Sequence, residues 1–222
     1  MLQRLALFDL DNTLLAGDSD HAWGEFLISK NLVNQTVHRE KNNQFYQDYL
    51  KGRLDIHDYV KFSLRPILSY TEEKRRLLHE EFMQKAVKPL LTDKAFELVA
   101  KHQKNGDYTL IITATNTFIT APIAKLFKVD QLLATDIEII DNKLSGRIVG
   151  VPCYQEGKVL KLKRWLSDNT TGLSLDNCVF YTDSINDLPL LEQVSTPIAV
   201  NPDPQLLKIS TENGWKIQNL HG

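Results

Sequence analysis

We predict an α/β fold for this chain, in which a doubly wound, Rossmann-like parallel sheet carries an inserted helical cap. Short apolar segments at residues 5–8, 108–112 and 178–181 each stop at a polar cluster, as strands buried on both faces of a parallel sheet do. Strand and helix patterns alternate after about residue 88, and this alternation indicates a doubly wound sheet. Residues 16–88 show only helical patterns. We therefore expect a core at 1–15 and 89–222 and a cap at 16–88.

The 222-residue chain has an ordinary composition, with 42% hydrophobic and 24% charged residues and a formal net charge of −2, typical of a globular protein. This charge gives no reason to expect nucleic acid or an anionic membrane as a partner. No apolar run approaches the length of a membrane span, so we expect a cytoplasmic protein. We also expect a monomer or homodimer that binds a small molecule. Cys153 and Cys178 are expected to remain free thiols, because pairing is uncommon in a reducing compartment.

The first predicted strand leads directly into two acids. Asp9 and Asp11 follow the apolar residues 5–8, at the end of a parallel strand where open α/β sheets bind their ligands. Residues two apart in an extended chain point the same way, so both carboxylates can face one ligand. Repulsion between the two charges favours a cation or a shared proton. A simple turn is the alternative, because Asp, Asn and Thr often end strands and cap helices.

The predicted cap consists of helices. Ser19 or Asp18 can cap a first helix, which carries Trp23 and Phe26 on one side. Further helical patterns cover about 35–50, 56–64 and 71–83, and the 56–64 pattern stops near Pro66. These residues are too apolar for a linker.

Beyond the cap, helices and strands alternate. We predict helices at about 92–104, 119–127, 157–166 and 187–194 and from 204 onward, strands at 108–112, 178–181 and 197–200, and strand and hairpin structure at 132–151. Asn105 and Gly106 are a typical helix end. Pro122 is placed in the first turn of its helix, where proline is tolerated. Residues 141–143 are the predicted hairpin turn.

Polar side chains follow all three predicted core strands. They are Asp9 and Asp11 after the first, Thr113 after the second, and Asp183, Asn186 and Asp187 after the third. Because the carboxyl ends of parallel strands meet at one edge of the sheet, we expect these side chains to converge there, joined by Lys158 from the start of a helix. Buried like charges would destabilise the fold. Carboxylates, a hydroxyl and an ammonium group instead suit Mg²⁺ and a phosphate.

Together these motifs resemble those of the haloacid dehalogenase superfamily, in the branch of phosphatases with a small helical cap that includes phosphoserine phosphatase. Taken singly, Thr113 could be a helix cap and Lys158 an exposed helix charge, but their order beside the acidic pairs favours the resemblance. The resemblance implies a Mg²⁺-dependent phosphomonoester hydrolase. Asp9 would be the nucleophile that forms an aspartyl-phosphate, and Asp11 the general acid and base.

The same resemblance implies the other site roles. Asp9, the main-chain carbonyl of Asp11, and Asp183 would hold Mg²⁺, with Asp187 supporting the metal site directly or through water. The phosphate-binding residues would be Thr113, Lys158 and Asn186. In this set Asn186 would orient Asp183 or Lys158.

The cap acids closest to the nucleophile in sequence are Asp18 and Asp20, with His21 beside them, and these are the expected substrate-recognition residues. A capped helix start is the alternative. In phosphoserine phosphatases, an acid at the position of Asp18 meets the substrate amino group, and a cap arginine pairs with its carboxylate. Here Ser63 occupies the arginine position, which argues against a carboxylate on the substrate.

We therefore expect a small amino-alcohol or amino-acid phosphate as substrate. The segment at 146–158 resembles a bacterial subfamily related to phosphoserine phosphatase, some members of which are linked to histidinol phosphate. Histidinol phosphate carries an amine and an imidazole and no carboxylate, so it is the expected substrate. Phosphoserine is the alternative.

Other protein classes share parts of this pattern. A two-component receiver domain also combines acids, Thr and Lys around Mg²⁺, but its phosphorylated Asp ends a later strand and it has no helical cap. A dehalogenase needs neither Asp11 nor magnesium. A phosphotransferase that uses the same aspartyl-phosphate remains open. A non-catalytic phosphate-binding module is disfavoured because Asp9, Asp11, Lys158 and Asp183 are all present.

Overall fold

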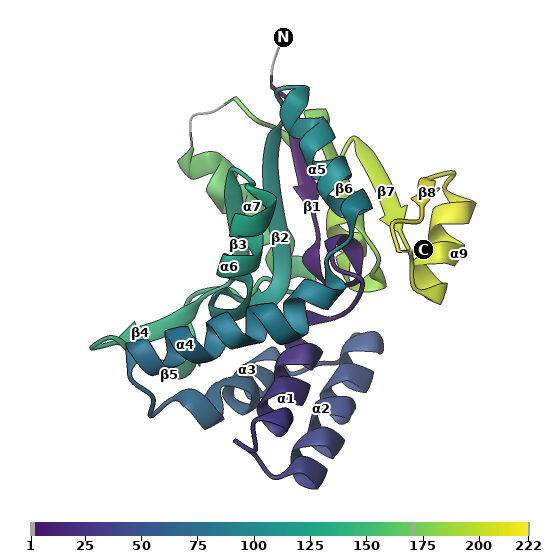
Figure 1. The fold of residues 1–222 in the computed structure, drawn as a ribbon. Helices are drawn as coiled ribbons and strands as arrows, with labels where there is room; N and C mark the ends of the chain where they lie inside the picture. The colour runs from purple at the N-terminus through teal and green to yellow at the C-terminus, as the bar shows by residue number, and fades with distance from the viewer. Residues whose placement is uncertain (1–2, 170–171, 222) are drawn as a thin grey trace.

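The computed structural model describes residues 3–169 and 172–221, and its centre is a six-stranded sheet (Figure 1). Its strands are β1 (Leu5–Phe8), β2 (Tyr108–Asn116), β3 (Gln131–Thr135), β6 (Cys178–Thr182), β7 (Thr196–Val200) and β8 (Lys216–Gln218), in the order β3-β2-β1-β6-β7-β8. Every neighbouring pair is parallel. The predicted doubly wound α/β fold is confirmed.

Helices cover both faces of the sheet. Successive residues of a strand point to opposite faces, so each face presents its own set of apolar side chains to the helices. Ala6 and Phe8 of β1 pack in a buried cluster with residues of α5 (Asp93–Lys104) and α6 (Thr117–Phe127). Leu5 and Leu7 pack in a second cluster with residues of α7 (Glu156–Asp168), α8 (Leu188–Leu191) and α9 (Pro204–Glu212). The strand β1 is therefore buried on both sides, as its continuous apolar sequence predicts.

Four helices lie below the sheet in Figure 1: α1 (Ser19–Ser29), α2 (Gln35–Leu50), α3 (Ile56–Leu64) and α4 (Glu72–Phe82). Each begins after a side chain that accepts hydrogen bonds from its first turn, namely Asp18, Asn34, Asp55 and Thr71, as N-caps do. These helices match the predicted ones closely. That residues 16–88 form a separate cap domain stays a prediction.

The four lower helices differ in how they are anchored. Trp23 of α1, Val60 of α3 and Phe82 of α4 belong to the same buried cluster as Phe8 of the sheet. No residue of α2, all of which the structure describes, belongs to either buried cluster. Its buried residues are His38 and Asn42. Polar contacts and partly buried rings therefore hold α2, which covers the site described below.

Some predicted boundaries are wrong. β2 continues to Asn116 instead of stopping at residue 112. Because α6 begins at Thr117, Pro122 lies inside the helix and not in its first turn. The predicted helix at 187–194 is a short turn at Ile185–Asp187 followed by α8. β8 was not predicted, since its three residues give too short a pattern.

The predicted hairpin is present as a separate two-stranded sheet of β4 (Ile137–Ile140) and β5 (Lys143–Ile148). Its turn residues Asp141 and Asn142 have φ angles of 48° and 60°, which suit a two-residue hairpin loop. Cys153 and Cys178 are buried and free, as predicted. Within residues 3–169 and 172–221, the helices are all too short or too polar to cross a membrane.

Candidate active site

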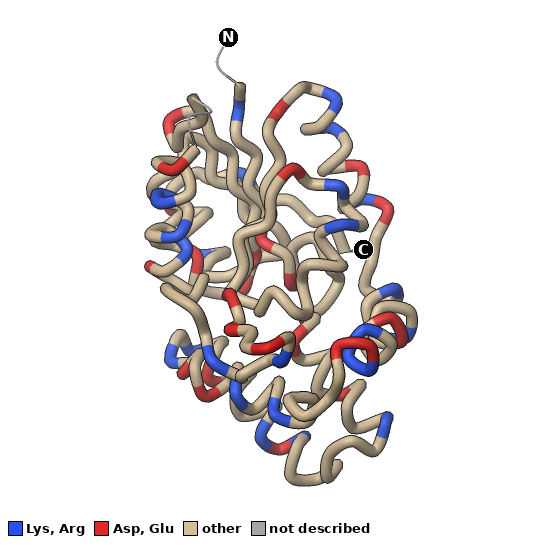
Figure 2. Tube along the Cα trace, turned by 90° about the vertical axis from the view of Figure 1, so that its left-hand side faces the viewer, with Lys and Arg blue, Asp and Glu red and all other residues tan. Residues whose placement is uncertain are grey.

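Three neighbouring strands bring the predicted site residues together. β1 lies between β2 and β6 and is parallel to both. Asp9 follows β1 directly, Thr113 lies in the second half of β2, and Asp183 follows β6. Asp9, Thr113 and Asp183 therefore share one edge of the sheet, although Thr113 lies within β2 and not after it as predicted. Figure 2 shows acidic positions gathered at the middle of the molecule, between the sheet and the lower helices, while Lys and Arg lie mainly on outer segments.

Lys158 links two of the acids. Its side chain is 2% exposed, and its Nζ donates to Oδ1 of Asp9 at 2.8 Å and to Oδ2 of Asp187 at 2.7 Å. Asp187 also accepts a hydrogen bond from the Thr182 hydroxyl at 2.6 Å. Burial alone would lower the pKa of Lys158, but Asp187 and Asp9 raise it above its usual value. Lys158 is therefore a buried ammonium ion held between two carboxylates.

The start of α7 places Lys158 at this point. A Cβ atom on Gly157 would lie 2.0 Å from the carbonyl oxygen of Pro152, so glycine alone allows the helix to begin this close to the preceding loop. Gln155, just before the helix, has φ 49° and ψ −124°, a conformation that non-glycine residues rarely adopt. The close packing at Gly157 and the unusual backbone conformation of Gln155 therefore set the position from which Lys158 reaches the acids.

The loop after β1 curls so that its side chains reach two neighbouring segments. Asn12 adopts φ 54°, which asparagine tolerates better than most residues. Asp11 accepts hydrogen bonds from the Ser19 main-chain N–H at 2.6 Å and from the Thr115 hydroxyl at 2.8 Å. Thr13 donates to Oδ1 of Asp183 at 3.0 Å. The loop therefore directs Asp11 toward α1 and β2. It also joins the residues after β1 to Asp183, which follows β6.

Burial raises the pKa values of the acids in this site. For Asp9, burial is the largest cause, Lys158 opposes it, and Asp187 adds to it, so that the pKa rises to about 7. The pKa of Asp11 rises to about 6, through burial and then the charge of Asp18. Burial and the charge of Asp9 raise the pKa of Asp183 well above its usual value. One ammonium ion does not balance these carboxylates, and a further cation would relieve their repulsion.

The donor set fits Mg²⁺. Lys158 donates to Oδ1 of Asp9, and Thr13 donates to Oδ1 of Asp183. The Oδ2 atoms of these two carboxylates take no part in these hydrogen bonds. Within residues 3–169 and 172–221, no three acidic, His or Cys side chains form a complete metal cage. A main-chain carbonyl, water and phosphate oxygens would have to complete the coordination, which is the arrangement that Mg²⁺ commonly uses.

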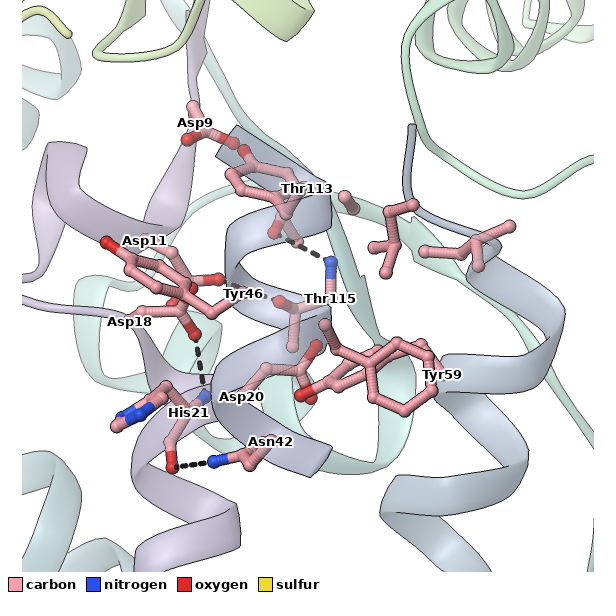
Figure 3. Close-up of a pocket in the computed structure, with 15 residues that line it drawn as sticks. Asp9, Asp11, Asp18, Asp20, His21, Asn42, Tyr46, Tyr59, Thr113 and Thr115 are labelled. Carbon is pink, nitrogen blue, oxygen red and sulfur yellow. Dashed lines mark hydrogen bonds between the residues drawn. The ribbon is translucent and has the colours of Figure 1, made fainter. Parts of the chain in front are cut away.

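A cavity lies over these acids, between the strand ends and the lower helices. Figure 3 shows Asp9 and Thr113 at one end of the labelled residues and Asp20, Asn42 and Tyr59 at the other. The lining residues are Asp9, Asp11, Asp18, Asp20, His21, Asn42, Phe45, Tyr46, Tyr49, Leu54, Ile56, Tyr59, Thr113, Ala114 and Thr115. None of these described lining residues is Lys or Arg. The cavity is therefore acidic and aromatic, and it suits a ligand with positive charge away from its phosphate.

The predicted recognition residues lie at the start of α1. Oδ1 of Asp18 accepts a hydrogen bond from the His21 main-chain N–H at 2.8 Å, so Asp18 is a helix cap and also lines the cavity. Burial raises the pKa of Asp18, and burial and the charge of Asp18 raise the pKa of Asp20 well above its usual value. The rings of His21 and Tyr46 lie 5.7 Å apart, measured between centroids. Ser63 is buried and does not line the cavity.

Asn186 has partners other than the predicted Asp183 and Lys158. Its Nδ2 donates to the Tyr49 carbonyl at 2.9 Å, and its Oδ1 accepts from Nε2 of Gln155 at 3.1 Å. Nε2 of Gln155 also lies 3.0 Å from the carbonyl of Gly52. We call Gln155, Asn186 and these two carbonyls the latch, because they join the end of α2 and the α2–α3 loop to the segments before α7 and after β6. A part for Asn186 in phosphate binding stays a prediction.

Several residues of the site were not predicted. Thr13 follows Asp11 by two residues, and Thr115 follows Thr113 by two, so alternation along an extended chain could have found both. Phe45 and Tyr49 lie four residues apart on α2, a spacing that puts them on one face of a helix. The sequence alone does not show which face of α2 meets the cavity. No sequence pattern indicated that Tyr59 or Gln155 would belong to the site.

The chain is similar to known proteins over most of its length. Residues 6–192 match the model of the haloacid dehalogenase-like hydrolase family. The chain belongs to this family. It is 43% identical to a histidinol-phosphatase of Neisseria meningitidis serogroup C, over 99% of this chain and all of that protein. It is 30% identical to a phosphoserine phosphatase of Mycobacterium tuberculosis, over 99% of this chain and 71% of that protein.

Solved structures of similar fold include a protein of unknown function from Bordetella pertussis, with a TM-score of 0.90 and 41% identity over 99% of this chain and all of that one. A substrate-bound phosphoserine phosphatase has a TM-score of 0.71 at 17% identity, over 100% of this chain and 94% of that one. The second likeness is one of fold. The family match and the curated relatives identify the chain as a haloacid dehalogenase-type phosphatase.

Proposed function

We propose that this phosphatase hydrolyses histidinol phosphate, with Mg²⁺ and through an aspartyl-phosphate on Asp9. The observation that carries the proposal is the cavity over Asp9, whose described lining contains four carboxylates, several aromatic rings and no Lys or Arg. Histidinol phosphate offers this cavity an amine and an imidazole. The 43% identity to a histidinol-phosphatase over the whole chain supports the same substrate, and with it a place in amino-acid biosynthesis.

Phosphoserine fits this cavity less well. Its carboxylate would need a cationic partner, and the described lining offers no Lys or Arg. Lys158 lies near Asp9, but its Nζ already bonds to two carboxylates. Asp18 and Asp20 would repel a third carboxylate placed beside them. The amine of an amino alcohol, in contrast, would pair with Asp18.

In the proposed reaction, Asp9 attacks phosphorus, and the bond from phosphorus to the substrate alcohol breaks as the bond to Asp9 forms. Asp11 gives its proton to the leaving alkoxide, which its pKa of about 6 permits near neutral pH. Asp11 then takes a proton from water, which attacks phosphorus and releases phosphate from Asp9. The hydrogen bonds from Ser19 and Thr115 fix the Asp11 carboxyl for both steps.

The other polar residues would bind the phosphate and the metal. Lys158 has three N–H donors, and two of them are directed to Asp9 and Asp187, so one is left for a phosphoryl oxygen. Thr113 lines the cavity on the β2 side, and its hydroxyl accepts a hydrogen bond from the Thr115 main-chain N–H at 3.2 Å. Asp9, the main-chain carbonyl of Asp11, and Asp183 would hold Mg²⁺, which when bound neutralises charge on the phosphoryl oxygens. Asp187 would act through Lys158, because its carboxylate bonds to that ammonium.

The test is phosphate release in the presence of Mg²⁺ from L-histidinol phosphate, L-phosphoserine, phosphoethanolamine, a sugar phosphate and p-nitrophenyl phosphate. We expect the highest kcat/KM with histidinol phosphate. A higher value with phosphoserine would reject the substrate proposal while leaving the reaction class in place. Turnover only when an alcohol acceptor is supplied would make the protein a phosphotransferase.

A further inference from the structure

Asp20 has an environment that the proposed reaction does not explain. It lies at the end of the cavity away from Asp9, next to Tyr59 (Figure 3). Its Oδ1 is buried and has no hydrogen-bond partner among the described residues, while hydrogen bonds from Thr115 and Tyr59 to the carboxyl group partly offset the rise in its pKa. A buried carboxylate oxygen without a donor is costly, and most buried polar atoms in proteins have a partner. The protein therefore keeps an acid here at a cost to its own stability.

The residues around Asp20 form a site for a flat group. The rings of Phe45 and Tyr59 meet edge to face, with 5.2 Å between centroids, and both line the cavity with Asp20. Asn42 is 2% exposed and is held by a hydrogen bond from its Nδ2 to the His21 carbonyl at 3.3 Å. Aromatic walls favour a ring or a delocalised cation over a small hydrated ion.

The packing beside Asn42 leaves little freedom at this end of the cavity. A Cβ atom on Gly24 would lie 2.4 Å from Nδ2 of Asn42. Only a glycine in α1 therefore allows the amide to lie where it does. Asn42 and Asp20 come from different helices, and α1 and α2 approach each other closely at this point next to the carboxylate.

We propose that Asp20, with Tyr59, Phe45 and Asn42, forms a second recognition subsite that binds a nitrogen-containing ring of the substrate through an N–H donated to Asp20. The inference rests on the proposed function and deepens it. Asp18 would select the amine near the phosphate, and Asp20 would select the ring farther away. The enzyme would then distinguish an amino-alcohol phosphate that carries a ring donor from one that does not.

The experiment compares Asp20→Asn with the unchanged enzyme on four esters. Histidinol phosphate has both the amine and the ring, an imidazolylethyl phosphate has the ring alone, phosphoethanolamine has the amine alone, and p-nitrophenyl phosphate has a ring without an N–H donor. Asn keeps the size of Asp but cannot ionise to pair with a ring N–H. Because a hydrogen bond to a charged group contributes about 1.5–3 kcal/mol, we expect kcat/KM for the two imidazole esters to fall about 10- to 100-fold. The values for the other two esters should not change, and unchanged p-nitrophenyl phosphate turnover also shows that the variant folds.

A matched variant separates the two subsites. Asp18→Asn also removes a charge that raises the pKa of Asp11, so its effect is read relative to p-nitrophenyl phosphate. On that scale it should reduce kcat/KM for the two esters that carry an amine and not for imidazolylethyl phosphate. Tyr59→Phe keeps the ring wall but removes the hydroxyl beside Asp20, and we expect a smaller loss confined to the imidazole esters. If Asp20→Asn itself fails to fold, Tyr59→Phe decides the question by the same comparison.

An equal loss on all four esters, or no loss on the imidazole esters, would overturn the subsite. The proposed function is judged separately, by the substrate ranking of the unchanged enzyme. If phosphoethanolamine were its best substrate, histidinol phosphate would be rejected as the natural substrate. The selective effect of Asp20→Asn would still decide whether the ring subsite exists.

Discussion

Asp9 is buried against Lys158 and close enough to Asp11, Asp183 and Asp187 for the like charges to matter. We expect Asp9→Asn to lower kcat by at least about a thousandfold, because an amide does not form the covalent intermediate. The fold should be kept, since the substitution removes one of several repelling charges and changes no volume. Phosphate release and thermal unfolding measure the two effects.

The control for this variant is Asp141→Asn, which changes the same atoms in an exposed hairpin turn. Asn tolerates the positive φ of that position as well as Asp does. Activity at the level of the unchanged enzyme is expected. Substantial residual turnover by Asp9→Asn itself would mean that another group is the nucleophile.

The raised pKa values predict how metal binding depends on pH. A carboxylate must lose its proton before it binds Mg²⁺, and burial raises the pKa of Asp9 to about 7. Protons therefore compete with Mg²⁺ below this pH and not above it. For Asp9 alone, the apparent Mg²⁺ affinity should fall about tenfold from pH 8 to pH 6. Calorimetric titration at the two values measures it, and equal affinities would show that the acids are already ionised in the metal-free protein.

At the scale of elements, the latch joins the loop between α2 and α3 to the residues before α7. Gly52 has φ +66°, and a Cβ atom there would lie 3.3 Å from both Oδ1 of Asn186 and Nε2 of Gln155. Gly52→Ala should therefore disturb the latch and raise KM several-fold, because the closed cavity becomes harder to form. Steady-state kinetics with the best substrate of the panel measures this.

Gly214 provides a matched control for the backbone. It has the same φ of +66°, but nothing lies within 4 Å of the Cβ position. Both alanine variants should lose about 1–2 kcal/mol of unfolding free energy, the usual cost of a left-handed residue, and only Gly52→Ala should raise KM. If the two variants had the same KM, the latch would have no part in closing the cavity.

At the scale of the whole molecule, the sequence predicts the elements better than it predicts the cavity. Continuous apolar strands and helix caps such as Asp55 and Thr71 are local features, so the fold class and the lower helices could be predicted. Asp9, Asp11, Asp183 and Asp187 could be placed because they follow the ends of predicted strands. β8 is too short to give a pattern, and Pro122 was misplaced because the start of α6 depends on the cap at Asn116. Which rings line the cavity depends on how α2 packs over α1, and neither helix determines this alone.

The lack of deeply buried apolar side chains in α2 also affects how ligands enter. α1, α3 and α4 each share the buried cluster with the sheet. In contrast, α2 is joined to α1 by a half-buried ion pair of Arg39 with Glu25 and by the bond from Asn42, and its end is held by the latch. The free energy of local unfolding is larger where a segment has more buried contacts. We therefore expect α2 to detach from the protein before α1, which keeps its acids in place. Amide hydrogen exchange should then be faster in residues 35–50 than in α1 or α4, and should slow most in α2 when substrate or phosphate is bound. The acids would form a permanent wall of the binding site, and the rings of Phe45, Tyr46 and Tyr49 would reach the substrate only after it has entered.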